Sequence, residues 1–393
     1  MMTNNTNLLQ ACDWTFPVPI AYGPGRLKEL ASLCAQAGMR NPLIVTDRGS
    51  RDLPFIADAQ TYLQAGGMGA GLYASISPNP RDDEIAAGKT AYRNGGHDGI
   101  VAIGGGSGMD GGKAVCLVAN NDIDLFAFNY DVSVPEIGAE QRFPPLICVP
   151  TTAGTGAETE STAMITDTAR MMKFCVWHPN VKPAFAVLDP EITLGLPKTL
   201  TAWTGVDALV HAVEAYCVPS FHPLCDGAAL EALRLISAWL PDAVENPTHV
   251  EARGGMLVGS CLAGIAFLKG LGVVHAISHM VGAEYDTHHG LTNAIVLPAA
   301  LRFNADAMAD KIQPMAEALG LEDKSYEGFY GAICGLLDRL EIPKSLVEIG
   351  VPGDCAAAMA EKAHKDAAAA TNVRPVSVVE IKAIIEEALV SGR

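Results

Sequence analysis

Basic residues are scarce in this sequence of 393 residues, which has 27 Lys and Arg against 44 Asp and Glu. The resulting net charge of −17 argues against nucleic acid and against an anionic membrane as partners, because both are bound through basic surfaces. Charged residues of either sign make up only 18% of the chain, while hydrophobic residues make up 49%. This composition is typical of a globular protein with a large buried interior and excludes a disordered chain.

The sequence also lacks the signals that take a protein into or across a membrane. No uninterrupted apolar run reaches the ~18 residues that mark a transmembrane helix. The first residues, MMTNNTNLLQACDW, have neither the basic start nor the long apolar stretch of a signal peptide. The ten cysteines are scattered from Cys12 to Cys355 without a CxxC pair, which disfavours a disulfide framework. We therefore expect a cytoplasmic protein with reduced thiols.

The first half of the chain alternates between apolar strands and helices. Short β-rich runs occur at 41–47, 99–107, 144–156 and 184–189, and a helical stretch at 81–94 lies between the first two. Continuous apolar strands separated by helices predict a parallel sheet that is covered on both faces.

After Pro197 the pattern becomes helical. Ala, Leu and Glu recur at helical spacing in 201–217, 224–240, 251–268 and 376–390. The Ala-rich stretch 356–370 also favours helix, because Ala is the strongest helix former. Since the length suits two domains, we expect an α/β domain over 1–194 and an all-helical domain over 195–393.

A glycine-rich stretch, AIGGGSGMDGGKA at 102–114, follows a strand and leads into a predicted helix. Glycines let the backbone approach a ligand closely, and the free N–H groups of the new helix can bind phosphate. Gly106, Gly108 and Gly111 form a literal G-x-G-x-x-G, while the P-loop pattern is broken by Ser107 and Ala114. The stretch favours a diphosphate site over an ordinary turn.

Two further features near strand ends leave alternatives open. The loop PTTAGTGAETES at 150–161 offers hydroxyls and bare amides that suit phosphate or ribose, but equally a plain turn. Asp47 ends the first strand, where an acidic side chain can bind ribose hydroxyls and favour NAD over NADP. It can equally cap a turn.

The stretch GVDALVHAVEAY at 205–216 carries a polar stripe. Asp207, His211 and Glu214 stand at i, i+4 and i+7, so they share one face of a helix that is otherwise apolar. An ionised Asp facing a core is costly unless it is paired or bound to a metal. Asp and His together at this spacing are therefore a stronger metal signal than a lone histidine.

Four of the ten histidines lie in GVVHAISHMVGAEYDTHHG, residues 272–290. His275 and His279 are four apart on a second predicted helix, and His288 and His289 are adjacent in a loop. HAISH lacks the Glu of HExxH, so a metalloprotease would have no general base. Asp207, His211 and two of these histidines would form an N3O site that suits Fe(II) or Zn(II).

Taken together, these motifs resemble the iron-containing (group III) alcohol dehydrogenase family, in the superfamily of glycerol dehydrogenase and dehydroquinate synthase. The resemblance covers nearly the whole chain, from FPVPIAYGPG through LIVTD, PNP, GGGSGMD, PTTAGTGAE and GVDALVHAVEAY to HAISHMVGAEYDTHHGLTNAIVLP. It implies the dehydroquinate synthase-like fold, in which a Rossmann-like parallel sheet binds the dinucleotide and a helical domain binds the metal.

The resemblance also implies the site residues. The ligands of one divalent metal, Fe(II) first and Zn(II) as the alternative, are Asp207, His211, His275 and His289. His279 falls on a further active-site histidine of the family and is our candidate for relaying the hydroxyl proton. The implied NAD positions are Asp47, Asn79, Gly104, Gly105, Gly106, Ser107, Asp110, Thr151, Thr152, Thr155 and Lys173.

Three positions depart from the family pattern, and the first, Ala157 in place of the usual Ser of AGTGSE, is a small change in a turn. His288 stands where many relatives have Pro, so we interpret it as a neighbour of the site rather than a ligand. Lys269 stands where many enzymes for simple alcohols have Asn. An ammonium that reaches the substrate would favour an anionic end, as in 4-hydroxybutyrate, but a solvated or snorkelling lysine is the alternative.

The resemblance implies an NAD(H)-dependent dehydrogenase that interconverts a small primary alcohol and its aldehyde in a cleft between two domains. It also implies a homodimer, built through the first strand of the N-terminal domain. A dehydrogenase for an omega-hydroxy acid such as 4-hydroxybutyrate is the first alternative. A dehydroquinate synthase-like lyase is more remote, because the predicted helical domain has few basic residues beside its histidines. A regulatory nucleotide-binding protein is disfavoured by the four intact ligands.

Overall fold

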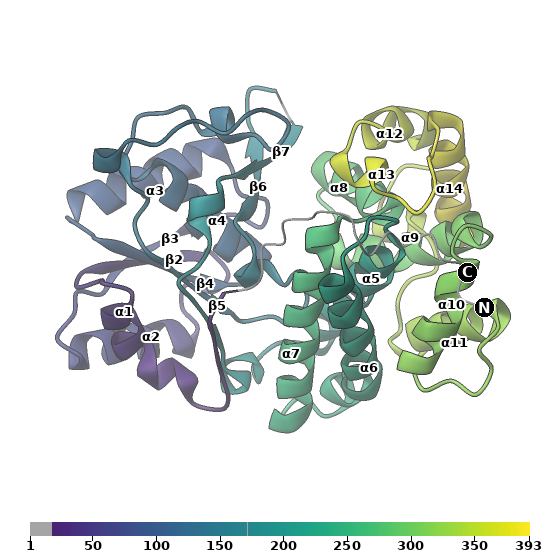
Figure 1. The fold of residues 1–393 in the computed structure, drawn as a ribbon, viewed down its shortest axis with the longest axis horizontal. Coiled ribbons are helices and arrows are strands. Elements are labelled where there is room, and N and C mark those ends of the chain that lie inside the picture. Colours follow the sequence, from purple (N-terminus) through teal and green to yellow (C-terminus); the bar gives the residue numbers. More distant parts are fainter. Residues whose placement is uncertain (1–17, 171) are drawn as a thin grey trace.

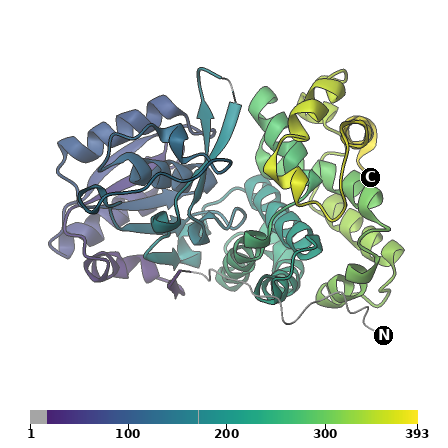
Figure 2. The same cartoon turned by 45° about the horizontal axis from the view of Figure 1, so that its top comes forward.

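The computed structural model describes residues 18–170 and 172–393, and it consists of a sheet domain and an all-helical region that lie side by side (Figures 1 and 2). Cys12 and the start of the chain, where no signal peptide is expected, lie outside the described residues. Among the described strands, six form one parallel sheet in the order β1-β8-β5-β4-β2-β3. They are β1 (Ile20–Tyr22), β2 (Pro42–Asp47), β3 (Gly71–Ile76), β4 (Gly99–Gly104), β5 (Leu146–Pro150) and β8 (Phe185–Leu188).

Helices cover both faces of this sheet, as the apolar strands predict (Figure 1). Ile44 of β2 joins a core with α1 (Leu30–Gln36) and α2 (Pro54–Ala65) on one face. Its neighbours Leu43 and Val45 join a second core with α3 (Asp82–Asn94) and α4 (Gly106–Val118) on the other. Successive side chains of a strand point to opposite faces, so β2 has to be apolar throughout.

The strand order reverses between β2 and β4, which lie side by side although β3 separates them in the chain. In open parallel sheets, ligands bind beyond the carboxyl ends of the strands at such a reversal. Asp47 is the last residue of β2 and Gly104 the last of β4. The fold therefore places two of the expected cofactor residues at this position.

Several elements of the sheet domain differ from the prediction or add to it. β4 ends at Gly104 and β5 at Pro150, so the glycine and threonine loops that follow them are not part of the strands. β1 and β3 were not predicted. Neither was an antiparallel pair of strands, β6 (Thr162–Asp167) and β7 (Met172–Trp177), which extends from the sheet domain near the helical region (Figure 1).

The second half of the described chain is helical, as predicted, and most of its buried side chains form one large core. The predicted stretch 356–370 is interrupted, because Asp366 accepts a hydrogen bond from the backbone of Ala368 and starts a new short helix. The division of the domains at 194/195 stays a prediction. The helices are α5 (Lys198–Cys217), α6 (Pro223–Glu245), α7 (Val250–Ala266), α8 (Val273–Tyr285), α9 (His289–Asn304), α10 (Ala309–Ala318), α11 (Tyr326–Arg339), α12 (Ala356–Ala363), α13 (Ala367–Ala370) and α14 (Val378–Ser391).

One stretch among the described helices, Val250–Lys269, is long and apolar enough to cross a membrane by length and composition. It comprises α7 and the turn after it, and 67% of its most apolar window is buried inside the protein. α7 packs against α5 and α6. Helix packing within the core accounts for this apolarity.

Candidate metal centre and nucleotide site

Asp207, His211, His275 and His289 come together in the helical region, as the resemblance implies. α5 carries the first two, α8 carries His275, and α9 begins at His289. One ligand atom from each residue lies within 4.8 Å of the others. Four atoms bound about 2 Å from one cation would lie about 3–4 Å apart, so this cluster is close to the size of a metal site.

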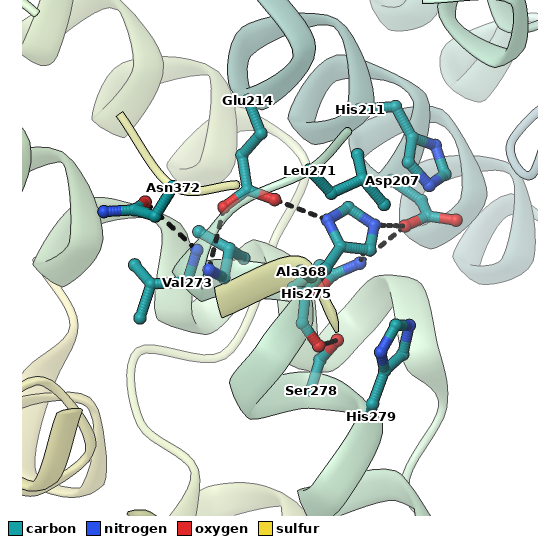
Figure 3. A network of polar contacts seen from close by, with 12 residues as sticks. Asp207, His211, Glu214, Leu271, Val273, His275, Ser278, His279, Ala368 and Asn372 are labelled. Atoms are coloured by element: carbon teal, nitrogen blue, oxygen red, sulfur yellow. Dashed lines mark hydrogen bonds and ion pairs between the residues drawn. The ribbon is translucent and has the colours of Figure 1, made fainter. Parts of the chain in front are cut away.

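The hydrogen bonds of the three histidines direct the same ring nitrogen into the cluster. Nδ1 of His211 lies 3.3 Å from the carbonyl oxygen of Gly154, and Nδ1 of His289 lies 3.3 Å from Ser278 Oγ. Nδ1 of His275 lies 2.6 Å from a carboxylate oxygen of Glu214 (Figure 3). With Nδ1–H donated to these acceptors, the lone pair of each Nε2 is left for a cation.

The electrostatics of the cluster also fit a cation. Burial lowers the pKa of His211, and it lowers those of His275 and His289 well below the usual value, so the three rings are neutral. Burial raises the pKa of Asp207, whose side chain is 2% exposed, although His211 acts to lower it. Asp207 Oδ1 lies 3.8 Å from His275 Nε2 and 3.6 Å from His289 Nε2. A divalent cation among these atoms would offset the cost of burying the carboxylate.

The contacts of Asn293 show that the space between the four clustered residues suits positive charge. Its amide nitrogen lies 2.7 Å from Asp207 Oδ1 and 3.1 Å from Nε2 of both His275 and His289. The amide oxygen is buried and has no hydrogen-bond partner among the described residues. Three possible acceptors thus surround one partly positive NH2 group, as the donor atoms of a cation site would surround a cation. The residues fit the metal that the resemblance implies.

His279 lies beside the cluster and is not among its four ligand atoms. Its ring stacks on that of His289 with 5.4 Å between centroids, and 17% of its side chain is exposed. Its Nδ1 lies 3.0 Å from Asp366 Oδ2. Burial acts to raise the pKa of Asp366, but the contact with His279 and the backbone of Ala368 lower it overall. An ionised Asp366 therefore holds one side of the His279 ring.

His288 has a different task from its neighbour His289. Its Nδ1 accepts a hydrogen bond from the backbone N–H of Leu291, so it caps the start of α9. Its ring packs on Trp203 with 5.0 Å between centroids. This geometry agrees with the interpretation of His288 as a neighbour of the metal ligands.

The two glycine and threonine loops of the sheet domain lie against each other. The backbone N–H of Thr151 donates to the carbonyl of Gly104, and a Cβ on Gly106 would lie 2.7 Å from Thr155. Gly105 caps α4 without any side-chain hydrogen bond, so the first N–H groups of α4, including that of Ser107, face no capping side chain. The hydroxyl of Thr152 is buried without a partner among the described residues. These unsatisfied donors suit a phosphate group.

Asp47 lies at the edge of the same region. Its carboxylate accepts hydrogen bonds from the backbone N–H and the hydroxyl of Ser50, at 2.9 and 2.8 Å. A Cβ on Gly104 would lie 2.9 Å from the same carboxylate, so the glycine loop passes directly beside it. Both alternatives from the sequence are thus compatible with the structure, because Asp47 closes a turn and also faces the glycine loop.

The remaining expected cofactor residues lie between the two halves of the molecule. Lys173 Nζ donates to Asn79 Oδ1 at 2.7 Å, and Asn79 Nδ2 donates to Asp286 Oδ1, at the end of α8, at 2.6 Å. The pKa of Lys173 is lowered overall because the side chain is buried, and the nearby carboxylates of Asp110 and Asp286 only partly offset this effect. Lys173 is also among the charges that lower the pKa of His289. Asn79 and Lys173 therefore join the sheet domain to Asp286 at the end of α8, and Asp110 interacts electrostatically with Lys173.

Lys269 does not have a free ammonium. Its Nζ lies 2.5 Å from Asp226 Oδ1 and 3.4 Å from the carbonyl of Tyr216, and its side chain is 1% exposed. The sequence analysis considered that Lys269 contacts the substrate or that it extends into solvent. The structure shows neither, because the ammonium is buried and paired with Asp226. Lys269 is a buried ion-pair partner near the end of α5.

Three residues that contact the cluster or the adjacent His279 were not assigned to the site from the sequence. Asn293 lies one helical turn after His289, a spacing that could have identified it. Glu214 belongs to the polar stripe of α5 but received no role. Asp366 is 87 residues from His279, and no sequence spacing connects them.

The chain matches family models along most of its length. Residues 17–190 match the model for iron-containing alcohol dehydrogenase, and residues 201–389 match the model for the C-terminal part of the Fe-containing alcohol dehydrogenase family. The chain belongs to the iron-containing alcohol dehydrogenase family. It is therefore an oxidoreductase, and membership implies NAD and a divalent metal.

Individual relatives of this family are similar over nearly their full length. An NAD-dependent methanol dehydrogenase from Bacillus methanolicus is 35% identical over 381 residues, which are 95% of this chain and 98% of the relative. A 4-hydroxybutyrate dehydrogenase from Cupriavidus necator is 34% identical over 380 residues, 93% of this chain and 96% of the relative. The crystal structure of a 1,3-propanediol oxidoreductase superposes with a TM-score of 0.92 at 34% identity, covering 97% of this chain and all of the other.

Proposed function

We propose that this enzyme interconverts a small primary alcohol and its aldehyde, with NAD(H) as the hydride carrier and one divalent cation. The observation that carries the proposal is the cluster of Asp207, His211, His275 and His289, whose ligand atoms lie within 4.8 Å of one another. Three nitrogen ligands and one oxygen ligand suit Fe(II), which the family name favours, and Zn(II) is the alternative.

The residues around the cluster have distinct roles in this proposal. A cation held by the four ligands supplies Lewis acidity, which lowers the pKa of an alcohol hydroxyl. His279, beside the ligands but not one of them, moves the hydroxyl proton. Asp366 holds Nδ1 of His279, so the opposite nitrogen of the ring is the one left to exchange the proton. Asp207 and His275 are buried, so water has little access to this side of the site.

We assign nucleotide binding to the sheet domain, for which 1–194 remains our proposed extent. The nicotinamide supplies the hydride chemistry, and the protein contributes its orientation. The start of α4 with Gly104, Gly105, Gly106 and Ser107 would bind the diphosphate. Asp47 would favour NAD over NADP. The further contact residues in this proposal are Asn79, Asp110, Thr151, Thr152, Thr155 and Lys173.

A 4-hydroxybutyrate substrate is the second candidate, and the similarity to a 4-hydroxybutyrate dehydrogenase favours it. The ion pair between Lys269 and Asp226 removes the charge that the sequence suggested for binding this anion. Activity measured in both directions, with methanol, longer primary alcohols, 1,3-propanediol, lactaldehyde and 4-hydroxybutyrate, would decide between the candidates. Net accumulation of NADH from an alcohol and NAD would exclude the lyase.

The assembly and location are proposals of the same kind. We infer a homodimer in the cytoplasm that acts on small alcohols or aldehydes and binds neither nucleic acid nor membrane. The acidic balance of 44 Asp and Glu against 27 Lys and Arg supports the last point.

The function is tested by replacing His275 with Ala. We expect His275→Ala to lose both its stoichiometric metal, measured by elemental analysis, and its dehydrogenase activity, because one of four ligands is removed. His364→Ala, at an exposed histidine outside the cluster, is the matched control and should keep both. A His275→Ala protein that holds no metal and remains fully active would refute the proposal.

A further inference from the structure

Glu214 is the third polar residue of the stripe on α5, and it faces the start of α8 (Figure 3). Its Oε1 accepts a hydrogen bond from the backbone N–H of Val274 at 2.8 Å. Its Oε2 lies 2.6 Å from Nδ1 of His275. Glu214 therefore joins the first turn of α8 to one of the four proposed metal ligands.

A glycine at the start of α8 makes room for the Glu214 carboxylate. α8 begins after Gly272, where a Cβ would lie only 2.6 Å from Glu214 Oε1. Gly272 gives α8 no side-chain cap, and the first N–H groups of the helix are bound instead by Glu214 and by Asn372, which accepts from Val273 at 3.2 Å. A carboxylate at this end of a helix is also favoured by the helix dipole.

The contacts of Glu214 determine which tautomer of His275 is stable. Oε1 accepts from the backbone N–H of Val274, and Oε2 lies within hydrogen-bond distance of Nδ1 of His275. A carboxylate that accepts at both oxygens leaves the proton of His275 on Nδ1. The lone pair of Nε2 then points toward Asp207 Oδ1, 3.8 Å away.

We propose that Glu214 is a positioning residue that fixes the tautomer and ring orientation of His275 and thereby strengthens divalent-cation binding. This inference rests on the proposed metal site. Partners that bind the outer nitrogen of a metal-ligating histidine typically contribute about 10–100-fold to metal affinity.

The isosteric substitution Glu214→Gln tests the proposal. The amide has one accepting and one donating end, so it cannot serve both Val274 N–H and His275 Nδ1–H. If its oxygen stays with Val274, its NH2 faces Nδ1 of His275 and moves the ring proton to Nε2, which can then no longer bind a metal. We expect Zn²⁺ affinity of the purified full-length protein, measured by chelator competition, to fall about 10–100-fold. The ¹⁵N spectrum of the metal-free protein should show the change of tautomer at His275.

Asp189→Asn is the matched control. The Asp189 carboxylate is also buried, and it accepts backbone hydrogen bonds from Gly25, Leu27 and Glu191 at 2.9–3.0 Å. It is not bonded to any of the clustered histidines, so Asp189→Asn should lower stability without changing Zn²⁺ affinity. A loss of Zn²⁺ affinity as large as in Glu214→Gln would show a general effect of destabilisation and would overturn the proposal.

The remaining outcomes separate this inference from the proposed function. A folded Glu214→Gln protein with unchanged Zn²⁺ affinity and an unchanged His275 tautomer overturns the role of Glu214. A wild-type protein that binds no divalent metal overturns the proposed function together with the inference. If Glu214→Gln does not fold, Gly272→Ala places a Cβ 2.6 Å from Glu214 Oε1, closer than these atoms can approach, so it displaces the carboxylate and should weaken Zn²⁺ binding in the same sense. Unchanged affinity in that variant overturns the proposal.

Discussion

At the scale of single residues, Lys269 can be separated from substrate binding by experiment. Replacing it with Met keeps the aliphatic chain but leaves Asp226, which is 29% exposed, without its cation. We expect Lys269→Met to lower the free energy of unfolding by about 2 kcal/mol, less than for a fully buried pair because water reaches Asp226. Denaturant titration measures this loss. The ratio of kcat/KM for 4-hydroxybutyrate to that for 1-butanol should stay the same.

Lys365→Met, at an exposed lysine, is the control for the loss of one positive charge. It should change neither the free energy of unfolding nor the ratio of the two substrates. A Lys269→Met protein with normal stability that selectively loses 4-hydroxybutyrate would return Lys269 to the substrate site and contradict the structure.

The helical period was sufficient to predict part of the candidate metal site. Asp207 and His211 share a face because they are four residues apart, and their chemistry marks that face as a metal candidate. Spacing could not choose between the adjacent His288 and His289, and here the family resemblance supplied the choice. Asp366 could not be found at all, because its contact with His279 depends on how α8 and the segment before α13 pack.

At the scale of secondary structure, the prediction failed where a local side-chain cap interrupts a helix and where the apolar alternation of a strand is weak. The Ala-rich stretch 356–370 favours one helix by propensity. In the structure α12 ends at Ala363, and a new helix, α13, begins after Asp366. β6 alternates between half-buried and buried residues, as a half-exposed strand should. Its buried side includes the small Ala163 and the polar Asp167, so the apolar alternation was too weak to be recognised.

The segment between β5 and β6 contains two buried glutamates, Glu158 and Glu160, and predicts a pH dependence. Burial raises the pKa of each to about 7 from a usual value of 4.5. The folded state therefore binds their protons more tightly than the unfolded state, and the free energy of unfolding falls as pH rises from about 4.5 to about 7. Glu160 also has a carboxylate oxygen without a partner among the described residues. We expect Glu160→Gln to be the more stable protein at pH above about 7 by up to about 3 kcal/mol.

Unfolding by denaturant at several pH values measures this difference, which should vanish below pH ~4.5, where both proteins carry a neutral side chain. Glu386→Gln on the exposed side of α14 removes a surface charge as the control and should show no such window. If the free energies of unfolding of wild type and Glu160→Gln change by the same amount between pH ~4.5 and ~7, burial does not raise the proton affinity of Glu160.

At the scale of the whole molecule, the sequence was sufficient to predict a parallel sheet and a helical region. It was not sufficient to predict the contacts between them. Strands that are apolar on both faces predict a covered parallel sheet, and helical periodicity predicts the second region. The contact between Asn79 and Asp286 joins residues 207 positions apart. No periodicity encodes it, because it depends on the packing of two separately formed cores. The family resemblance placed Asn79 at the cofactor but did not reveal this bridge.

The sheet itself suggests how two copies would assemble. β1 lies at the edge of the described sheet, paired with β8, and its residues Ile20 and Tyr22 are 40% and 47% exposed. An edge strand of this kind can pair with a second copy of itself. We expect light scattering to give twice the mass of one chain, and we expect Ile20→Lys to shift the protein toward the monomer, because charged side chains block edge pairing. Val379→Lys, at a valine that is 77% exposed on α14, should remain dimeric. A monomeric wild type, or a dimer unaffected by Ile20→Lys, would exclude assembly through β1.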